Sequence, residues 1–281
     1  MRADRPAVGR RFETSLMSEK RDQLRAQLTT HAPLLIAYSG GVDSAYLLAE
    51  AHAALGERAL GAIADSPSLP RQALADALAV AAQIGAKVEV VRTEEMENPA
   101  YASNPVNRCY FCKAELFTKL EGLARERGFQ AIAYGENADD MGHIRPGRQA
   151  AAEFSVLAPL RDAGLTKAEI RDFSRQLGLP TAEAPAQPCL SSRIPHGTPV
   201  TRHALAMVEQ GEAWVRSLGF RIFRVRHLAG AADAAPSARV QIAPEEMPAL
   251  TSELVARLTG GLGAVGYQAV EIDPAGYRSP A

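Results

Sequence analysis

The sequence predicts an α/β protein built on a doubly wound parallel sheet, with a second, smaller α+β domain at its C-terminal end. Three observations lead to this fold class. Short apolar segments alternate with longer helical segments up to about residue 134. A glycine-rich turn follows the first apolar segment, where sheets of this kind bind ligands. After residue 201 the order becomes helix, strand, strand, helix, strand, which is typical of a small α+β domain.

The first part of the chain supplies the elements of the parallel sheet. Residues 1–17 are expected to form a flexible arm, and a first helix is expected to begin at Ser18. Apolar runs flanked by turn residues predict strands at residues 34–38, 59–64, 87–92 and 130–134. An alanine-rich helix is expected after Ser44, through Leu47, Leu48 and Leu55, and helices are also expected at residues 69–84 and 110–127.

A capped helix and a proline-rich segment follow the sheet. Thr166 and Glu169 have the spacing of a capping box, which predicts a helix beginning there. Residues 181–200 are rich in Pro, Ser and Ala and are expected to form a loop or linker. Thr201 is then the expected N-cap of the next helix.

The last part of the chain is expected to add a small sheet. Alternating apolar residues predict strands at residues 220–228, 238–243 and 267–272. Pro244, at the favoured first position, is expected to open a helix between the last two. The predicted organisation is an arm, a nucleotide-binding domain, an active-site loop carrying Cys189 and a substrate domain, at residues 1–17, 18–180, 181–200 and 201–281.

Composition excludes several classes of protein. The chain has 281 residues, 47% of them hydrophobic, with 31 Lys and Arg against 32 Asp and Glu. This balance argues against disorder and against a protein that mainly coats nucleic acid. No apolar run approaches the roughly 18 residues that span a bilayer, and the N-terminus does not have the pattern of a secretory signal. Three cysteines are too few for a disulfide framework. A cytoplasmic enzyme is expected.

The glycine-rich turn SGGVDS predicts a nucleotide site. Gly40 and Gly41 allow the backbone to approach an anion closely, and the helix that follows directs its positive end at phosphate. Ser39 and Ser44 add hydroxyl donors. Asp43 is expected to reach phosphate through Mg²⁺, because a carboxylate repels phosphate directly. The turn lacks the Gly-Lys-Ser/Thr ending of a Walker A loop.

A second polar segment, YGENADD, follows the last predicted strand of the parallel sheet. Its simplest interpretation is a polar turn. Because the carboxyl ends of parallel strands meet at one edge, Asp139 and Asp140 are also candidate Mg²⁺ ligands, and Gly135 is a candidate part of the nucleotide site.

The three cysteines leave three interpretations open. Cys109 and Cys112 have C-x-x-C spacing at a helix start, where the helix dipole favours thiolates. Cys189 lies in the segment QPCLSSRIPHG. A zinc site, an iron–sulfur cluster, and redox or nucleophilic chemistry all remain possible on spacing alone. Three cysteine ligands would leave one iron of a four-iron cluster open to another ligand.

The chain resembles known ATP-using enzymes in several motifs. SGGVDS resembles the PP-loop of N-type ATP pyrophosphatases, which cleave ATP to AMP and pyrophosphate while adenylating a substrate. Taken together, the motifs resemble the LarE family of ATP-dependent sulfur transferases, which act in nickel-pincer nucleotide biosynthesis. They are SGGVDS, NRCYFCK, GENADD, RPG, PCLSSRIPHGTPVT and the late RVRH. The resemblance implies ATP, Mg²⁺ and a pyridinium mononucleotide whose carboxylate becomes a thiocarboxylate.

The resemblance also implies how sulfur is delivered. One class of LarE proteins sacrifices a cysteine at the position of Cys189. A second class, with three cysteines, resembles enzymes that carry sulfide on a 4Fe-4S cluster, and Cys109, Cys112 and Cys189 match that class. Turnover with an external sulfide source is therefore expected. Without a cluster, the Cys189 thiolate is the expected nucleophile, with Arg193 near it in the chain to lower its pKa.

The segment FRIFRVRHL contains a candidate phosphate site. Arg224 and Arg226 are two residues apart, so they share one face of the expected strand. A solvated strand face is the alternative, but the LarE resemblance favours binding of substrate phosphate by this pair. Glu212 resembles an acidic metal ligand of the family, while Gln241 stands where an acid is common.

Other functions remain as alternatives to sulfur transfer onto a small nucleotide. They are thiolation of tRNA, ammonia-dependent ligation as in amidotransferases, and a non-catalytic metal or cluster carrier. The near-neutral charge and lack of an evident RNA-binding module argue against the first. The three cysteines are unexplained by the second. The resemblance implies a homo-oligomer.

Overall fold

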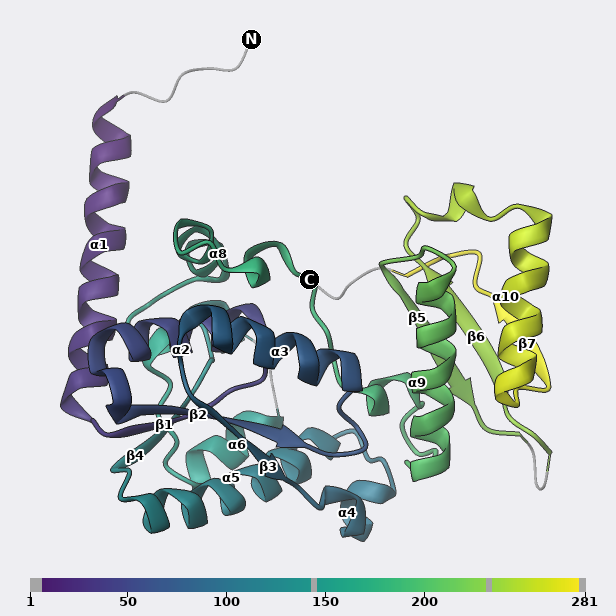
Figure 1. Ribbon diagram of the computed structural model, residues 1–281, viewed down its shortest axis with the longest axis horizontal. Helices are drawn as coiled ribbons and strands as arrows, with labels where there is room; N and C mark the ends of the chain where they lie inside the picture. Colours follow the sequence, from purple (N-terminus) through teal and green to yellow (C-terminus); the bar gives the residue numbers. More distant parts are fainter. Residues whose placement is uncertain (1–6, 143–145, 231–233, 278–281) are drawn as a thin grey trace. The chain divides into compact units, whose positions relative to one another are not determined.

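The computed structural model describes residues 7–142, 146–230 and 234–277, drawn as a ribbon in Figure 1. The chain forms two compact units, each with its own sheet. The first unit comprises Met1–Asp65, Gln72–Thr93 and Lys113–Ala184. The second comprises Ser66–Arg71, Glu94–Cys112 and Pro185–Ala281.

The first unit contains a four-stranded parallel sheet in the order β3-β2-β1-β4, which confirms the predicted fold class. Its strands are β1 (Leu34–Ala37), β2 (Ala59–Asp65), β3 (Val88–Arg92) and β4 (Ala131–Tyr134). The flanking helices are α1 (Ala7–Thr30), α2 (Val42–Leu55), α3 (Arg71–Ile84), α5 (Arg108–Arg127), α6 (Pro146–Glu153), α7 (Pro159–Asp162) and α8 (Lys167–Gln176). Short 3₁₀ turns η1 (Gly56–Arg58), η3 (Ala138–Gly142) and η4 (Pro180–Glu183) complete it.

Apolar runs form the strands because both faces of the sheet are covered. Leu34, Leu35 and Ile36 of β1 are each at most 1% exposed, as expected for a central parallel strand. The capping box of α8 is present as predicted, with Thr166 accepting from the Glu169 amide. Residues 1–17 were expected to form a flexible arm, but α1 is already helical from Ala7 onward.

The second unit packs two helices with a three-stranded sheet. Strand β5 (Phe223–Leu228) is antiparallel to β6 (Ser237–Ile242), which is parallel to β7 (Ala269–Ile272). Its other elements are η2 (Glu95–Glu97), α4 (Pro99–Ala102), η5 (Leu190–Arg193), α9 (Arg202–Ser217), η6 (Met247–Ala249) and α10 (Ser252–Val265). The core gathers residues such as Phe223, Val240 and Leu262, all at most 2% exposed.

Two predicted boundaries differ from the structure. The helix expected to open at Pro244 begins instead at Ser252, because Thr251 is the N-cap that accepts from the Leu254 amide. The second unit also takes in Ser66–Arg71 and Glu94–Cys112, rather than only residues beyond 180. These two loops join it through contacts such as the hydrogen bond from the Leu190 amide to the Ser68 carbonyl. Within the described residues, no helix is long and apolar enough to cross a membrane.

A buried carboxylate attaches α1 to α2. Glu50 is 1% exposed and accepts hydrogen bonds from Arg21 at 2.8 Å and from Arg25 at 2.7 Å. Replacing Glu50 with Gln leaves two guanidinium groups without their counter-charge, so we expect about 1–3 kcal/mol loss of the free energy of unfolding. Urea titration followed by circular dichroism measures this loss. Glu57→Gln, which removes an exposed pair with Lys87, is the control and should leave the midpoint unchanged. Equal midpoints for both variants would contradict the assignment.

Candidate functional site

The SGGVDS motif forms a tight turn between β1 and α2. Gly40 has φ of +76°, and a Cβ at this position would lie 2.6 Å from the Cβ of Ala77. Gly41 is the N-cap of α2, so no side chain covers the first amides of the helix. The positive end of the helix dipole therefore faces the turn, as an anion site requires.

Two serine side chains hold this turn closed. The Ser44 hydroxyl donates to the Gly41 carbonyl at 3.0 Å and accepts from the Ser39 amide at 3.2 Å. The two hydroxyl oxygens, of Ser39 and Ser44, are 3.0 Å apart. Hydrogen bonds within the motif thus fix the bent shape of the turn, which lowers the entropy lost when a phosphate binds.

Gly135 lies beside the same turn. A Cβ on Gly135 would lie 2.7 Å from the Ser44 amide nitrogen and 3.0 Å from the carbonyl carbon of Asp43. Since β1 and β4 are parallel neighbours, both turns leave the sheet at the same edge. Glycine is needed here for this close approach of two backbones.

Asp43 points its carboxylate into a charged cluster. Its Oδ2 accepts a hydrogen bond from the Lys167 ammonium at 2.6 Å. Its Oδ1 is buried and forms no hydrogen bond of normal geometry, although the Asn137 side chain lies beside it. Burial raises the pKa of Asp43, the Lys167 charge opposes this shift, and the Asp140 charge adds to it. The carboxylates of Asp43 and Asp140 therefore lie near each other, and a cation bound between them would offset the repulsion of their negative charges.

The two adjacent aspartates have different surroundings. Asp140 is 8% exposed and lies close enough to Asp43 to raise its pKa. Asp139 accepts instead from the backbone amide of Lys167 at 2.8 Å, at the start of α8. The donor chemistry fits Mg²⁺, because the buried oxygen of Asp43 has an unused acceptor position next to a second carboxylate.

Lys167 is a site residue that the sequence reasoning missed. The segment TKAE was interpreted only through its capping box, which the structure confirms. The lysine between the two capping residues is separated from Asp43 by 124 positions in the chain. A basic side chain at a helix N-terminus interacts unfavourably with the helix dipole. This unfavourable position was the signal in the sequence that could have identified Lys167 as a site residue.

All three cysteines belong to the second unit. Cys109 is exposed, and Cys112 and Cys189 are half-buried. Within the described residues, no three His, Cys, Asp or Glu side chains are gathered closely enough to form a metal-binding group. Burial raises the pKa of Tyr101, and Cys112 and Cys189 both lie close enough to the phenol for a thiolate at either position to raise it further.

A buried ion pair holds the loop that carries Cys189. Arg193 is 4% exposed and donates to both oxygens of Glu212, at 2.8 and 2.9 Å. Its remaining terminal nitrogen donates to the carbonyls of Pro188 and Cys189. Arg193 was expected to act on the thiol and Glu212 on a metal. In this structure, each is engaged with the other, and Arg193 fixes the backbone around Cys189.

A second buried arginine holds the same loop from the other side. Arg108 is 4% exposed and donates to the Ser191 carbonyl at 3.0 Å and to Asn104. The fully buried Asn104 side chain donates in turn to the carbonyls of Pro195 and Thr198, each at 2.8 Å. The position of the Cys189 loop is therefore fixed by side chains near the C-x-x-C segment.

A cavity of about 250 Å³ lies next to this loop. Its polar lining consists of Arg193, Arg226, Arg239, Ser192 and Gln241. Burial lowers the pKa of Arg226, and the nearby positive charge of Arg193 lowers it further. An anion in the cavity would relieve both effects.

The structure separates the two arginines of the RVR segment. Arg226 lines the cavity and donates to the Ser192 carbonyl at 2.7 Å and to Gln241 at 2.8 Å. Arg224 donates instead to the carbonyls of Phe223 and Ala186 and lies 4.5 Å from the ring centre of Tyr277. Among the described residues, it is Arg226 and not Arg224 that faces the cavity.

Comparison with known proteins decides the family. No family model matches the chain. An uncharacterized protein of Synechocystis is 40% identical over 94% of this chain and 97% of its own length. Pyridinium-3,5-bisthiocarboxylic acid mononucleotide synthase of Lactiplantibacillus plantarum, a LarE protein, is 28% identical over 94% of this chain and 93% of its own. The chain belongs to the LarE family. An uncharacterized Methanocaldococcus jannaschii protein is 26% identical over 69% of the chain and 73% of its own length.

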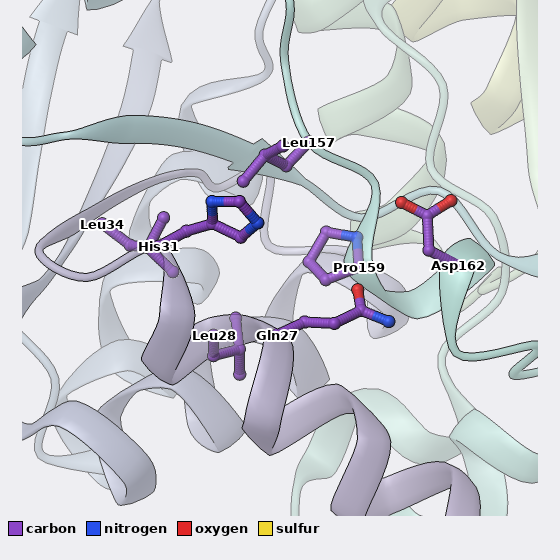
Figure 2. A pocket seen from close by; sticks show the side chains of 7 residues that line it. All are labelled: Gln27, Leu28, His31, Leu34, Leu157, Pro159 and Asp162. Carbon is purple, nitrogen blue, oxygen red and sulfur yellow. The ribbon is translucent and has the colours of Figure 1, made fainter.

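A much smaller cavity in this LarE-family chain lies at the other end of the parallel sheet, beside the first residue of β1. It has a volume of about 40 Å³, and His31, Gln27 and Asp162 contribute its polar groups (Figure 2). This volume accommodates about one water molecule. The turn at residues 39–44 leaves the opposite end of β1, so this cavity is separate from the candidate site.

Arg193→Lys tests whether this ion pair fixes the Cys189 loop. Lysine cannot reproduce the two-oxygen contact with Glu212 together with the backbone contacts. We expect about 2–4 kcal/mol loss of the free energy of unfolding of the second unit, measured in urea by Trp214 fluorescence. Arg239→Lys is the control, because its pair with Glu271 is half-exposed, and it should change the free energy by less than about 0.5 kcal/mol. An equally small effect of Arg193→Lys would contradict the assignment.

Proposed function

We propose that this protein is an ATP-dependent sulfur transferase that adenylates the carboxylate of a pyridinium mononucleotide and converts it to a thiocarboxylate. The observation that carries the proposal is the turn at residues 39–44, shaped for phosphate, with the half-buried Asp43 carboxylate and the buried Asp140 carboxylate beside it. The name of the Lactiplantibacillus relative supports the choice of substrate class and product. A thiocarboxylate forms readily from a carboxylate only after activation, which adenylation supplies.

The first half-reaction uses the groups of the first unit. The amides at the start of α2, with Ser39 and Ser44, bind the ATP phosphates. Asp43 and Asp140 would hold Mg²⁺, which neutralises the charge that develops on the leaving pyrophosphate. The substrate carboxylate attacks the α-phosphorus, and the bond to pyrophosphate breaks. Lys167, no longer needed by Asp43 when a cation binds, can direct its charge to the phosphates.

The second half-reaction needs a sulfur nucleophile. We infer that Cys109, Cys112 and Cys189 together hold a 4Fe-4S cluster, which would supply a sulfide at the iron without a protein ligand. The donor chemistry fits, since three soft thiols lie in one unit and Cys112 packs against the apolar cluster that contains Leu190, the neighbour of Cys189 in the chain. The thiols are not gathered at metal-binding distance here, so their side chains must close on a cluster. The alternative is attack by the Cys189 sulfur itself, which displaces AMP and forms a thioester. Loss of the Cα proton and cleavage of the Cβ–S bond would then release the thiocarboxylate and leave dehydroalanine at residue 189.

The cavity beside the Cys189 loop is the proposed site for the substrate phosphate. Arg226 presents a half-buried guanidinium whose hydrogen-bond partners are a carbonyl and a side-chain amide rather than a carboxylate. A phosphate would supply the missing negative charge and place the mononucleotide next to Cys189. A homo-oligomer and an external sulfide source remain predictions of the family resemblance.

Pyrophosphate release tests the first half-reaction. The wild-type protein, given ATP, Mg²⁺ and pyridinium-3,5-biscarboxylic acid mononucleotide, should release pyrophosphate only when the mononucleotide is present. Asp43→Asn should slow release by at least about 100-fold, and Lys167→Met by about 10-fold or more. Lys87→Met, which alters an exposed pair in the same unit, should leave the rate unchanged. No release by the wild type, or full activity of Asp43→Asn, would overturn the proposal.

The number of turnovers tests how sulfur is delivered. After anaerobic reconstitution with iron and sulfide, the wild type should form several products per chain, and Cys109→Ala, Cys112→Ala and Cys189→Ala should each abolish this. A colourless, iron-free protein that turns over repeatedly would contradict the cluster. Product limited to one per chain, with loss of the mass of H₂S from Cys189, would indicate the sacrificial reaction instead.

A further inference from the structure

A row of polar side chains crosses the three-stranded sheet of the second unit. Gln241 on β6 lies opposite Arg224 on β5 in the antiparallel register. On the other side of β6, the Asp273 amide donates to the Val240 carbonyl at 2.8 Å, so Asp273 continues the pairing of β7 beside Gln241. Because side chains two residues apart share a strand face, Arg226 lies on the same face as Arg224 and Gln241. Gln241 therefore has arginines on one side and a carboxylate on the other.

The hydrogen bonds in this row give the Gln241 amide one orientation. The Asp273 carboxylate accepts from Nε2 of Gln241 at 2.8 Å, and Oε1 of Gln241 accepts from Nε of Arg226 at 2.8 Å. An ionised carboxylate can only accept hydrogen bonds, and a guanidinium can only donate them. The amide nitrogen must therefore face Asp273, and the amide oxygen must face Arg226.

Asp273 is itself held in place. Its Oδ1 accepts from the Ala275 amide at 3.0 Å, while its Oδ2 is the oxygen that accepts from Gln241. The hydrogen bond from Gln241, followed by that from Ala275, lowers the pKa of Asp273, so it is a carboxylate at neutral pH. This fixed acceptor prevents the Gln241 amide from turning over.

Gln241 holds Arg226 without cancelling its charge. Besides the bond from Nε to Gln241, Nη1 of Arg226 donates to the Ser192 carbonyl at 2.7 Å. Two of the three guanidinium nitrogens are thus held by oxygens, and neither oxygen carries a formal charge. The position of the Arg226 side chain is fixed at the cavity wall, while its positive charge stays available to an anion.

The other arginines that line the cavity have carboxylate partners. Arg193 donates to Glu212 at 2.8 Å, and Arg239 donates to Glu271 at 3.0 Å. Arg226 lies directly opposite Arg239 in the strand pairing. Like charges opposite each other destabilise a sheet, so an anion in the cavity would offset this repulsion.

We propose that Gln241, oriented by Asp273, makes the cavity selective for the doubly charged phosphate of the mononucleotide. The inference rests on the proposed function, because it takes the cavity to be the site of the substrate phosphate. Gln241 fixes Arg226 and leaves its charge to the phosphate. Asp273 is a positioning residue that acts through Gln241. The substitution Gln241→Glu would keep the reach to Arg226 but would neutralise the charge that phosphate needs.

The main test exchanges the two side-chain types in one protein, Gln241→Glu with Asp273→Asn. This exchange variant keeps the net charge and the number of hydrogen bonds in the row, because the new amide can donate to the new carboxylate, which accepts from Arg226. It moves one negative charge from position 273 to the neighbour of Arg226. We expect a folded protein by circular dichroism that has lost its preference for phosphate.

Isothermal titration measures this preference with pyridinium-3,5-biscarboxylic acid mononucleotide and the nucleoside that lacks its phosphate. Wild type should bind the mononucleotide at least about 10-fold more tightly than the nucleoside. The exchange variant should bind the mononucleotide about 10–100-fold more weakly than wild type does and the nucleoside equally well. Equal losses for both ligands would mean that the exchange only deforms the cavity. That result, no loss at all, or no preference in wild type would overturn the inference.

Asp273→Asn alone separates the orientation of the amide from the charge of the sheet. Removal of a negative charge would by itself strengthen the binding of an anion. The substitution also allows the Gln241 amide to turn its NH₂ group toward Arg226, which displaces the guanidinium. We expect the second effect to be larger, with mononucleotide binding about 3–10-fold weaker. Tighter binding would overturn the positioning role of Asp273.

Glu271→Gln is the matched control for this charge. Glu271 lies two residues before Asp273, and its carboxylate accepts from Arg239 rather than from Gln241. Binding of the mononucleotide should be unchanged or tighter in this variant, because a negative charge is lost while the Gln241 amide keeps its orientation. If the exchange variant does not fold, the opposite signs expected for Asp273→Asn and Glu271→Gln still decide the inference.

Inorganic phosphate is a probe that does not depend on the proposed reaction. The nuclear magnetic resonance signal of the Arg226 Nε–H group, assigned by its loss in Arg226→Lys, should shift with added phosphate in wild type and not in the exchange variant. If it shifts but wild type releases no pyrophosphate from ATP with the mononucleotide, the proposed function fails and the role of Gln241 in binding phosphate stands. Normal pyrophosphate release with an Arg226 signal that is insensitive to phosphate overturns the inference alone.

Discussion

The parallel pairing of β1 with β4 is the constraint on which the candidate nucleotide site depends. The register places Ala37 opposite Tyr134, so the turns that follow both strands leave the sheet at the same level. The chain continues from β1 to β2 on one side, while β4 lies on the other. Such a switch in strand order opens a crevice at the carboxyl edge. Gly135 then allows a backbone approach that no other residue would tolerate, and Asp43 and Asp140 come to face one another.

Two arginines in the second unit differ in whether a carboxylate neutralises their charge. Arg193 has a complete set of partners, including both oxygens of Glu212, so it is neutralised and its removal would leave a buried charge. Arg226 is half-buried, and its hydrogen-bond partners are the neutral oxygens of Ser192 and Gln241. Burial lowers the pKa of Arg226, and the positive charge of Arg193 lowers it further. The difference identifies Arg226 as the one that gains most from an anion.

Local pattern was enough to predict most of the fold. Apolar runs gave the strands, and the caps at Thr166 and Thr201 gave helix starts, because these signals act between near neighbours. The helix start predicted at Pro244 was wrong because Thr251, later in the chain, is the N-cap of that helix. The turn at residues 39–44 was recognisable because its glycines and serines are contiguous. Its bent shape follows from contacts within the motif itself.

What could not be predicted depends on contacts between distant segments. Lys167 reaches Asp43 across 124 positions, and Tyr101 reaches Ser191 across 90. The role of Arg193 was expected from its closeness to Cys189 in the chain. Its side chain instead turns to Glu212, a contact that only the packing of α9 against the loop determines. Periodicity carries no information on such pairs.

The two half-reactions of the proposed function would make different demands on the chain, and each unit has groups that fit one of them. Adenylation would start from an ionised carboxylate, so it would need positive charge near the phosphates; the first unit offers the start of α2, Lys167 and the carboxylates of Asp43 and Asp140. Sulfur transfer would need a soft nucleophile beside the activated acyl group. The second unit holds all three cysteines, and the buried side chains of Arg193 and Arg108 donate to the backbone of the loop that carries Cys189. These contacts would keep the loop in place during the second step.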